Sequence, residues 1–200
     1  MRRRVHKRFD MEIRYERARR RNMSSASYGL HKCILVLDGL KPDFNIGKIF
    51  RSADAFGVRE IHVIGVPAFD PDPAKGSVRW VKYQMHDDFA SCYQALKEKE
   101  YSIITLEPGS DQVLGKVEFM PKTAFVLGHE EFGLSFDRHQ YPDITSLSIP
   151  QWGHVQSLNV SIAGAIVVYE YVRQHGRPLS HGLPQKASSV TTRYRKSSHG

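Results

Sequence analysis

The sequence predicts an α/β fold, a mostly parallel sheet with helices on both faces. Short, continuous apolar runs recur along the chain, which is typical of strands that are buried on both faces. Segments with apolar residues at helical spacing lie between these runs, and alternating strands and helices imply βαβ crossovers. The 200 residues, 40% hydrophobic and 25% charged, fit one globular domain with appendages and exclude a disordered or fibrous chain.

Five strands are expected, at residues 33–37, 61–64, 103–106, 124–127 and 147–149. Three helices are expected between or after them. The first has apolar residues at i, i+3, i+4 and i+7, namely Ile46, Ile49, Phe50 and Ala53. We expect Asn45 to cap its start and Gly57 to follow its end.

The second expected helix covers residues 88–99, with the same spacing at Phe89, Cys92, Tyr93 and Leu96. The third carries its apolar row at Leu158, Ile162, Ala165, Ile166 and Tyr169. Gly176 and Pro178 should end it. Residues 67–75 are rich in Pro and Asp and predict a loop.

Positive charge is concentrated at the two ends of the chain. Residues 1–22 hold ten Lys and Arg against three acids, and residues 175–200 hold five against none. The body, residues 23–174, has a net charge of −4, within a total of +8. Basic extensions on an acidic body suit a polyanion, and nucleic acid is the leading partner. A membrane surface is disfavoured because Phe9, Met11, Ile13 and Tyr15 alternate instead of forming an apolar helical stripe.

The charge map and composition divide the chain into three parts. A basic arm covers residues 1–27 and ends in a polar break, residues 24–27, that is consistent with a linker. The folded domain covers residues 28–176. A basic tail, residues 177–200, lacks periodicity and is expected to be disordered, although a solubilising or purification tail is an alternative for it.

Cysteine usage and hydropathy indicate a cytoplasmic protein. No run of eighteen apolar residues occurs, and no apolar run follows the basic N-terminus, so we expect neither secretion nor a membrane partner. Cys33 and Cys92 lie far apart in apolar segments, which excludes a disulfide framework. The ten histidines show no H-x-x-x-H or Cys/His grouping, so we expect no metal and regard His154 as a loop residue.

The first candidate motif lies at the start of the helix near residue 45. Gly47 and Arg51 are four residues apart, and on a face opposite the apolar stripe the small Gly47 would leave room for a ligand beside the guanidinium. Asn45 would hold the turn, and Lys48 with the helix N-terminus would favour an anion. The alternative is a capped surface helix with solvated charges.

The second candidate motif, residues 127–134, directly follows an apolar strand. Gly128 and Gly133 surround an acidic pair, which predicts a loop whose backbone approaches a ligand closely. Neither the dinucleotide fingerprint nor a P-loop is present. Glu130 or Glu131 could serve a ribose or an amino group, or could cap the next helix.

The third candidate motif joins a Pro/Gly loop to a helix that opens with Ser157, Asn159 and Ser161. Ser and Asn favour caps over helix interiors, and three such residues exceed what one cap requires. The pattern therefore indicates a ligand or crowded backbone packing at this helix start.

Taken together and in this order, the three motifs resemble those of the SpoU (TrmH-type) RNA ribose 2′-O-methyltransferases, over residues 33–174. The N-x-G-x-x-x-R motif is matched by Asn45, Gly47 and Arg51, and the G-x-E motif with its following glycine by Gly128, Glu130 and Gly133. The third motif is matched by Ile149, Pro150, Ser157, Leu158, Asn159, Val160, Ser161 and Ala163. The sequence departs from the usual pattern of this family at two places, the bulky, acidic residues 129–132 and the pair Gln151–Trp152.

The resemblance implies a C-terminal trefoil knot that holds S-adenosylmethionine, and a homodimer whose active site uses both chains. It places Arg51 on the ribose 2′-hydroxyl, as a base or a positioning group. The residues that would organise this site are Asn45, Glu130, Ser157 and Asn159. Main-chain groups would hold the cofactor near Leu127, Gly128, Ile149, Gln151 and Leu158.

The implied partner is RNA, held by the arm residues Arg2, Arg3, Arg4, Arg19, Arg20 and Arg21 and by Lys48. We expect tRNA more than rRNA, because no large separate RNA-binding domain precedes the catalytic one. Two alternatives stay open. One is a catalytically inactive RNA-binding or RNA-assembly protein with the same fold, and the other is an enzyme that methylates a base.

Overall fold

The computed structural model describes residues 2–110 and 112–176, and side chains from residue 9 onward. It contains one six-stranded sheet in the order β3-β2-β1-β5-β4-β6, and every pairing is parallel. The strands are β1 (His31–Asp38), β2 (Val58–Ile64), β3 (Tyr83–His86), β4 (Ser102–Leu106), β5 (Thr123–Leu127) and β6 (Thr145–Leu147). The predicted α/β class is confirmed. The expected tail, residues 177–200, and the side chains of Arg2, Arg3 and Arg4 lie outside the described part.

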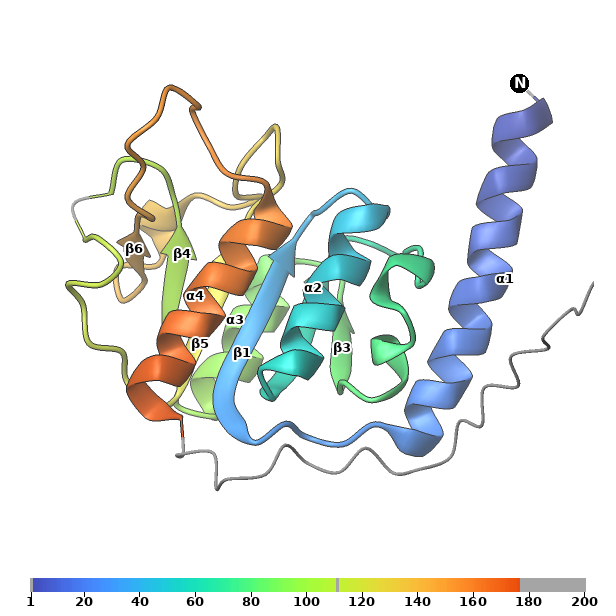
Figure 1. Ribbon diagram of the computed structural model, residues 1–200, viewed down its shortest axis with the longest axis horizontal. Coiled ribbons are helices and arrows are strands. Elements are labelled where there is room, and N and C mark those ends of the chain that lie inside the picture. Colours follow the sequence, from blue (N-terminus) through green and yellow to red (C-terminus); the bar gives the residue numbers. More distant parts are fainter. Residues whose placement is uncertain (1, 111, 177–200) are drawn as a thin grey trace, which may run out of the picture.

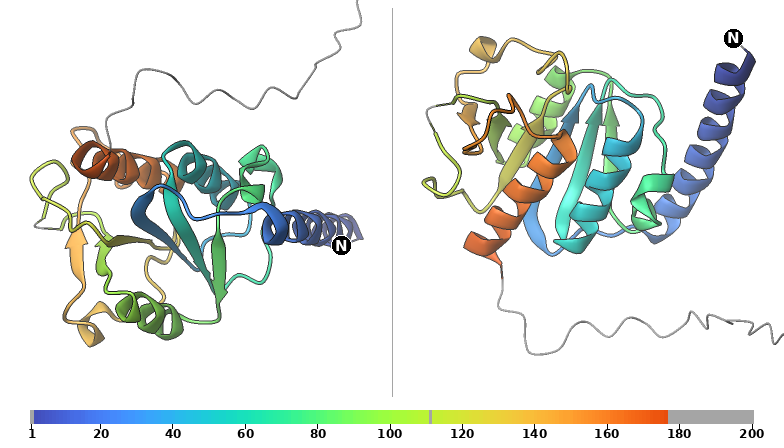
Figure 2. Two further views of the ribbon diagram at one scale, coloured as in Figure 1. Left: turned by 90° about the horizontal axis from the view of Figure 1, so that it is seen from below. Right: turned by 45° about the horizontal axis from the view of Figure 1, so that its top comes forward.

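Helices cover both faces of the sheet, as predicted (Figures 1 and 2). Helices α2 (Phe44–Ala55) and α4 (Val160–His175) lie side by side on one face, and α3 (Phe89–Glu98) lies on the other. Each face has its own apolar cluster: Leu35 and Leu37 of β1 pack under α2 and α4, whereas Ile34 and Val36 pack under α3. Burial on both faces explains why the central strands consist of continuous apolar runs.

Each of the five predicted strands has a counterpart, although the last, predicted at residues 147–149, lies two residues earlier as β6. The sixth strand, β3, is not among the predicted strands. It lies at the sheet edge and pairs only with β2. Its residues are only partly buried, so they show no apolar run. An edge strand can be polar because solvent covers one of its sides.

Helix α2 begins two residues earlier than it would with Asn45 as its cap. Asp43 occupies the N-cap position, and Asn45 lies in the first turn. The expectation that Asn45 caps the helix is therefore wrong. The expected end is confirmed, because Gly57 follows the helix with φ +63°.

Gly47 is covered by the loop after β2, so the space for a ligand that was expected beside it is not present. A Cβ at this position would lie 2.9 Å from Ala74 N and 3.0 Å from Pro73 Cβ. Both residues belong to the short helix η1 (Asp72–Ala74) in the loop after β2. Gly47 therefore lets this loop pack against α2.

Helix α4 is confirmed, with Gly176 as its C-cap, but its predicted buried face is wrong. Ile162 and Tyr169 of the predicted row are 51% and 60% exposed. The residues that face the sheet are Val160, Ser161, Gly164, Val167, Val168 and Tyr171. The helix carries apolar residues on more than one side, so spacing alone did not select the side that meets the sheet.

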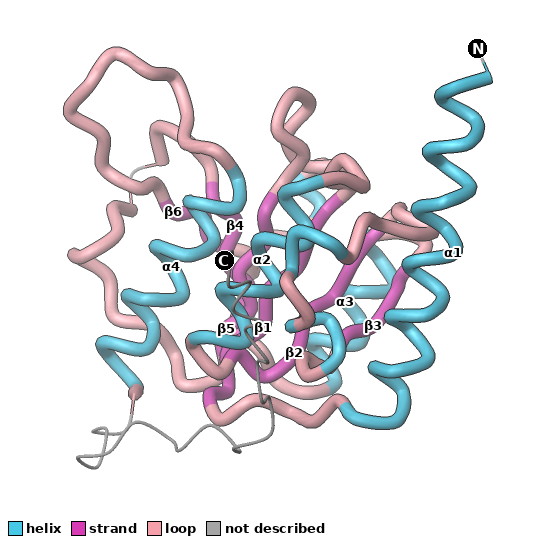
Figure 3. The backbone as a smooth tube through the Cα atoms, turned by 45° about the vertical axis from the view of Figure 1, so that its right-hand side comes forward, coloured by secondary structure: helices cyan, strands magenta, loops and turns pink. Residues whose placement is uncertain are grey.

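The basic arm forms helix α1 (Arg2–Ser25), which docks by its second half at the β3 edge (Figure 3). The Tyr15 ring meets Phe69 with centroids 5.1 Å apart. Asn22 Nδ2 donates to the carbonyls of Val78 and Val81, at 2.6 and 2.8 Å. The helix includes Ser24 and Ser25, so the connection to β1 is only residues 26–30. None of the described helices is apolar enough over sufficient length to cross a membrane.

Candidate active site

The three sequence motifs meet at the carboxyl ends of the strands. Asn45 of α2 donates from Nδ2 to Oε1 of Glu130, in the loop after β5, at 2.5 Å. Asn159, the N-cap of α4, donates from Nδ2 to Asn45 Oδ1 at 3.2 Å. Residues separated by 85 and 114 positions are thus joined in one hydrogen-bonded chain. Ligands of open parallel sheets bind at this edge.

The capping geometry of α4 fixes the direction of this chain. Asn159 Oδ1 accepts from the backbone N–H and the hydroxyl of the buried Ser161, at 3.0 and 2.6 Å. Its Nδ2 must therefore donate, and Asn45 then accepts with Oδ1 and donates with Nδ2. This series of hydrogen bonds ends at the carboxylate of Glu130, which, while ionised, can only accept hydrogen bonds. This arrangement accounts for the excess of short polar residues at the start of α4.

The loop after β5 is closed by its own backbone. The N–H groups of His129 and Gly133 donate to each other's carbonyls at 2.7 and 2.9 Å. A Cβ at Gly128 would lie 2.7 Å from Gly133 C, and Gly133 has φ +73°. The two glycines are thus needed for the turn itself. Glu131 pairs with Lys41 at 3.2 Å, which leaves Glu130 alone to meet Asn45. Neither acid caps η3 (Arg138–Gln140), where Asp137 is the N-cap.

A cavity of about 910 Å³ lies beside these hydrogen-bonded side chains, at the ends of β4, β5 and β6. Its volume is in the range of cofactor sites. All five residues expected near the cofactor line it: Leu127, Gly128, Ile149, Gln151 and Leu158. Glu130, Ser157 and Asn159 line it as well. Gln151 Oε1 is buried and has no hydrogen-bond partner among the described residues.

Three charged residues that line the cavity, Glu107, Asp137 and Arg138, were not selected from the sequence. Arg138 Nε lies 3.3 Å from Glu107 Oε1, and both residues line the cavity. Glu107 directly follows β4, so the rule that ligands bind beyond strand ends could have selected it. Arg138 belongs to η3, which the sequence pattern did not indicate.

Arg51 does not line the cavity of this single chain. Its side chain is exposed on α2 and makes no hydrogen bond or ion pair with any described residue. Lys48 is exposed on the same helix. Arg19, Arg20 and Arg21 are exposed on α1, which lies at the β3 edge of the sheet (Figure 1). The cavity lies near β6, which forms the opposite edge of the sheet.

The model of the SpoU rRNA Methylase family matches residues 32–169. The chain belongs to this family. The SpoU match covers all three motifs and the strands whose ends form the cavity, and it identifies the chain as a methyltransferase. The part of the chain outside the match includes α1.

Named relatives fall into two groups by RNA substrate. The chain is 32% identical over 145 residues to the tRNA (guanosine(18)-2′-O)-methyltransferase of Thermus thermophilus, covering 70% of this chain and 74% of that protein. It is 34% identical over 155 residues to the 23S rRNA (guanosine-2′-O-)-methyltransferase of Nitrosomonas europaea, covering 75% and 59%.

Solved SpoU structures share the fold. The TrmH/SpoU tRNA modifying enzyme of A. aeolicus matches with a TM-score of 0.66 and 28% identity, over 82% of this chain and 84% of that one. AviRb of Streptomyces viridochromogenes, crystallised with AdoMet, matches with a TM-score of 0.65 and 27% identity. The match covers 74% of this chain and spans 60% of the AviRb chain.

Proposed function

We propose that this protein transfers a methyl group from S-adenosylmethionine to a ribose 2′-hydroxyl of RNA, with tRNA as the favoured substrate. One observation carries the proposal. The hydrogen-bonded chain Glu130–Asn45–Asn159 unites the three motifs at the rim of one cavity. The match covers 74% of the tRNA enzyme of Thermus thermophilus but 59% of the rRNA enzyme of Nitrosomonas europaea, which favours tRNA over rRNA.

The cavity has the properties that S-adenosylmethionine requires. Leu127, Ile149 and Leu158 supply apolar walls for an adenine ring, and the backbone of the loops at residues 128 and 151 supplies polar groups. Gln151 Oε1 has no partner among the described residues and could accept a hydrogen bond from the cofactor. A structure of the relative AviRb holds AdoMet. We propose that residues after β5 form the family's trefoil knot around this cofactor.

We propose that Arg51 acts at the sugar. The cofactor supplies an electrophilic methyl group, and the 2′-hydroxyl must lose its proton to attack it. The guanidinium can hold a phosphate and the 2′-oxygen in line, because it stays charged and donates in a fixed fork. A stronger version makes Arg51 the base. The turnover of Arg51→Lys as a function of pH separates the two versions, and wild-type turnover in this variant would refute both.

A second copy of the chain would supply Arg51 to the cavity. The face of α4 that carries Ile162 and Tyr169 is exposed, and Tyr169 contacts Phe56 after α2 with ring centroids 6.0 Å apart. An exposed apolar surface of this kind suits a two-fold interface. In such a homodimer, the exposed Arg51 of one chain would act at the cavity of the other.

We propose that α1 contributes to RNA affinity. The second half of α1 is docked through the buried side chains of Tyr15 and Asn22. Its N-terminal half extends from the β3 edge toward the side where the carboxyl ends of the strands lie (Figures 1 and 3). A basic helix that is held at one end can follow a phosphate backbone. A cytoplasmic location is consistent with Cys33 and Cys92, which are unpaired and lie on opposite faces of the sheet.

Two measurements test the proposal. Calorimetry with S-adenosylmethionine should show one site per chain, and no detectable binding would favour the inactive RNA-binding alternative. Mass spectrometry of nucleosides from tRNA and rRNA, with and without the gene, should show loss of one 2′-O-methyl nucleoside from tRNA. Loss of a base-methylated nucleoside would refute ribose methylation, and loss from rRNA alone would refute the preference for tRNA.

A further inference from the structure

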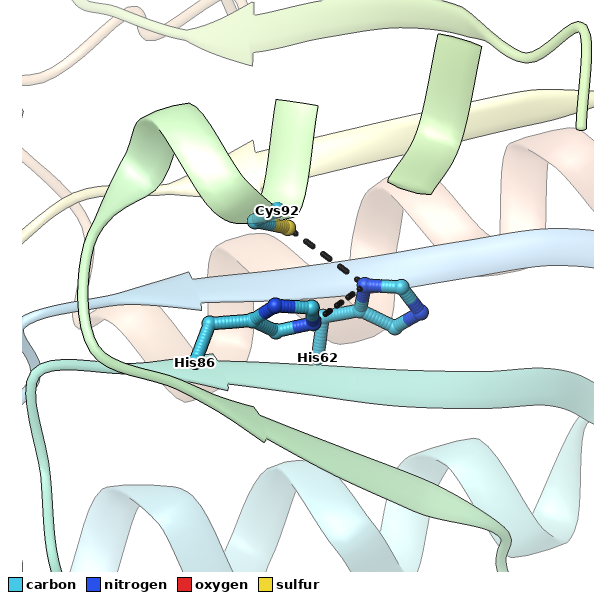
Figure 4. Close-up of side chains that lie close together, drawn as sticks. All are labelled: His62, His86 and Cys92. Atoms are coloured by element: carbon cyan, nitrogen blue, oxygen red, sulfur yellow. Dashed lines mark hydrogen bonds between the residues drawn. The ribbon is translucent and has the colours of Figure 1, made fainter. Parts of the chain in front are cut away.

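Three potential metal ligands converge on the α3 face of the sheet (Figure 4), and none of them lines the cavity. His62 lies on β2, His86 ends β3, and Cys92 lies on α3. His62 Nδ1 is 3.1 Å from His86 Nε2 and 3.4 Å from Cys92 Sγ. All three ligand atoms lie within 4.8 Å of one another. The fold thus creates a Cys/His grouping that the linear spacing does not show.

The grouping is a consequence of parallel pairing. In the β2–β3 register, His62 pairs with Gln84, and His86 lies two residues further on, so both imidazoles point to the same face. Helix α3 follows β3 directly and places Cys92 over the same face, where it belongs to the apolar cluster under α3. His62 and Cys92 are fully buried, whereas His86 is partly exposed. Solvent can therefore reach the group from the His86 side.

Hydrogen bonds alone do not satisfy this cluster. Both short contacts end on His62 Nδ1, which has one in-plane lone pair or one N–H, so it can make only one of them well. The other nitrogen, His62 Nε2, is buried without a hydrogen-bond partner among the described residues, and its nearest acid oxygen, Glu60 Oε2, is 3.8 Å away. Without an ion, His62 Nδ1 therefore leaves either His86 Nε2 or Cys92 Sγ without a good partner, whereas an ion between the three atoms would satisfy all of them.

We propose that His62 Nδ1, His86 Nε2 and Cys92 Sγ bind one Zn²⁺ ion. Zn–N distances of about 2.0–2.1 Å and a Zn–S distance of about 2.3 Å in a tetrahedron place two nitrogens about 3.3 Å apart, and a nitrogen and a sulfur about 3.5 Å apart. The observed separations of 3.1 and 3.4 Å are close to these values, and the third separation, between His86 Nε2 and Cys92 Sγ, is at most 4.8 Å. Binding exchanges the thiol proton of Cys92 for the metal, and the proton leaves to solvent.

The surroundings of His62 fit a metal ligand. With the metal on Nδ1, the proton on Nε2 would face Glu60 Oε2, 3.8 Å away, and an approach of under about 1 Å would complete the hydrogen bond of a carboxylate–histidine–zinc arrangement. Glu60 is held in place by Gln84 Nε2 at 2.7 Å and Lys99 Nζ at 3.2 Å. The carboxylate also offsets part of the charge of the ion.

The three side chains leave one position of the tetrahedron, which water from the partly exposed His86 side would fill. None of the ligands lines the cavity, so the proposed ion would stabilise the fold and take no part in methyl transfer. It would join the edge strand β3 and helix α3 to β2. This proposal departs from the sequence-based expectation that the protein needs no metal, although methyl transfer itself can still proceed without one. It does not depend on the proposed methyltransferase activity.

The test uses the full, untagged chain after removal of metals with EDTA. One equivalent of added Zn²⁺ should stay bound through gel filtration, and Mg²⁺ should not. Zinc at about 100 times its Kd should raise the Tm by about 5–10 °C. Co²⁺ in place of Zn²⁺ should give a thiolate-to-cobalt charge-transfer band, which reports directly on Cys92.

Matched variants decide between this cluster and adventitious binding. Cys92→Ala should lose the cobalt band and the Tm rise, whereas Cys33→Ala, at the other buried cysteine on the opposite face, should keep both. If Cys92→Ala does not fold, His86→Gln is the decisive variant because His86 is only partly buried, with the exposed His139→Gln as its control. No retained zinc in the unaltered chain, or unchanged binding in the variant that folds, would overturn the proposal.

Discussion

Replacing Gly47 by alanine tests whether this glycine serves a ligand or the fold. The added Cβ would lie 2.9 Å from Ala74 N, 3.0 Å from Pro73 Cβ and 3.2 Å from Pro73 Cδ. These atoms belong to the backbone and to a proline ring, so they cannot rotate away, and the loop after β2 must move. Such overpacking costs about 1–3 kcal/mol. The better helix propensity of alanine returns up to about 1 kcal/mol. We expect a net loss of roughly 0–2 kcal/mol.

Urea unfolding measures this change, with Gly153→Ala as the control, because a Cβ at Gly153 would meet nothing within 4 Å. The midpoint of Gly47→Ala should fall with an unchanged m value, while that of the control should stay within about 0.5 kcal/mol of the parent. If Gly47 faced open ligand space, alanine would instead stabilise the helix by about 1 kcal/mol. Stabilisation of that size would therefore refute the packing role of Gly47.

Three further predictions concern the site and its extensions. In a double-mutant cycle of Asn45→Ala and Glu130→Ala, urea unfolding should give a coupling energy of about 0.5–1.5 kcal/mol, and additive effects would show that their hydrogen bond contributes nothing. Deletion of residues 1–13, which lie ahead of the docked Tyr15, should make the slope of log K for RNA against log salt shallower by up to about 4, since five Lys and Arg are removed. Calorimetry should show unchanged S-adenosylmethionine binding, and an unchanged salt slope would count against the arm. Tyr169→Asp, at a 60% exposed site, should give a monomer by light scattering that has lost methyl transfer, and an active monomer would exclude a shared active site.

The central fold could be predicted because its strands are buried on both faces. The runs at β1 and β5 are fully apolar over four or five residues, a pattern that few other structures produce. Strand β3 has no such run, because it lies at the edge and is half covered. Helix α4 shows a different limit. It has apolar residues toward the sheet and away from it, so the sequence identifies a helix without identifying its buried side.

The candidate site could be predicted in part. The strand-end rule and the unusual Ser and Asn content located the segments that carry Glu130 and Asn159. The role of Asn45 was misjudged because Asp43, two residues earlier, takes the cap position, and this frees Asn45 to bridge Glu130 and Asn159. His62, His86 and Cys92 show no recognisable spacing, since the sheet register brings them together.

The network at the cavity bears on how the proton of the 2′-hydroxyl is removed. Each amide in the chain from Ser161 to Glu130 has one orientation that satisfies its neighbours, and the last donor, Asn45 Nδ2, ends on Glu130. Glu130 accepts the hydrogen bond from Asn45 Nδ2 at 2.5 Å, so this contact fixes its carboxylate at the rim of the cavity. We therefore expect Glu130 to hold the rim of the cavity and not to accept the proton. The exposed Arg51 of α2 has no competing partner among the described residues, so it is available for the substrate. Because Arg51 does not line the cavity of its own chain, this division of roles requires its guanidinium to act at the cavity of a second copy.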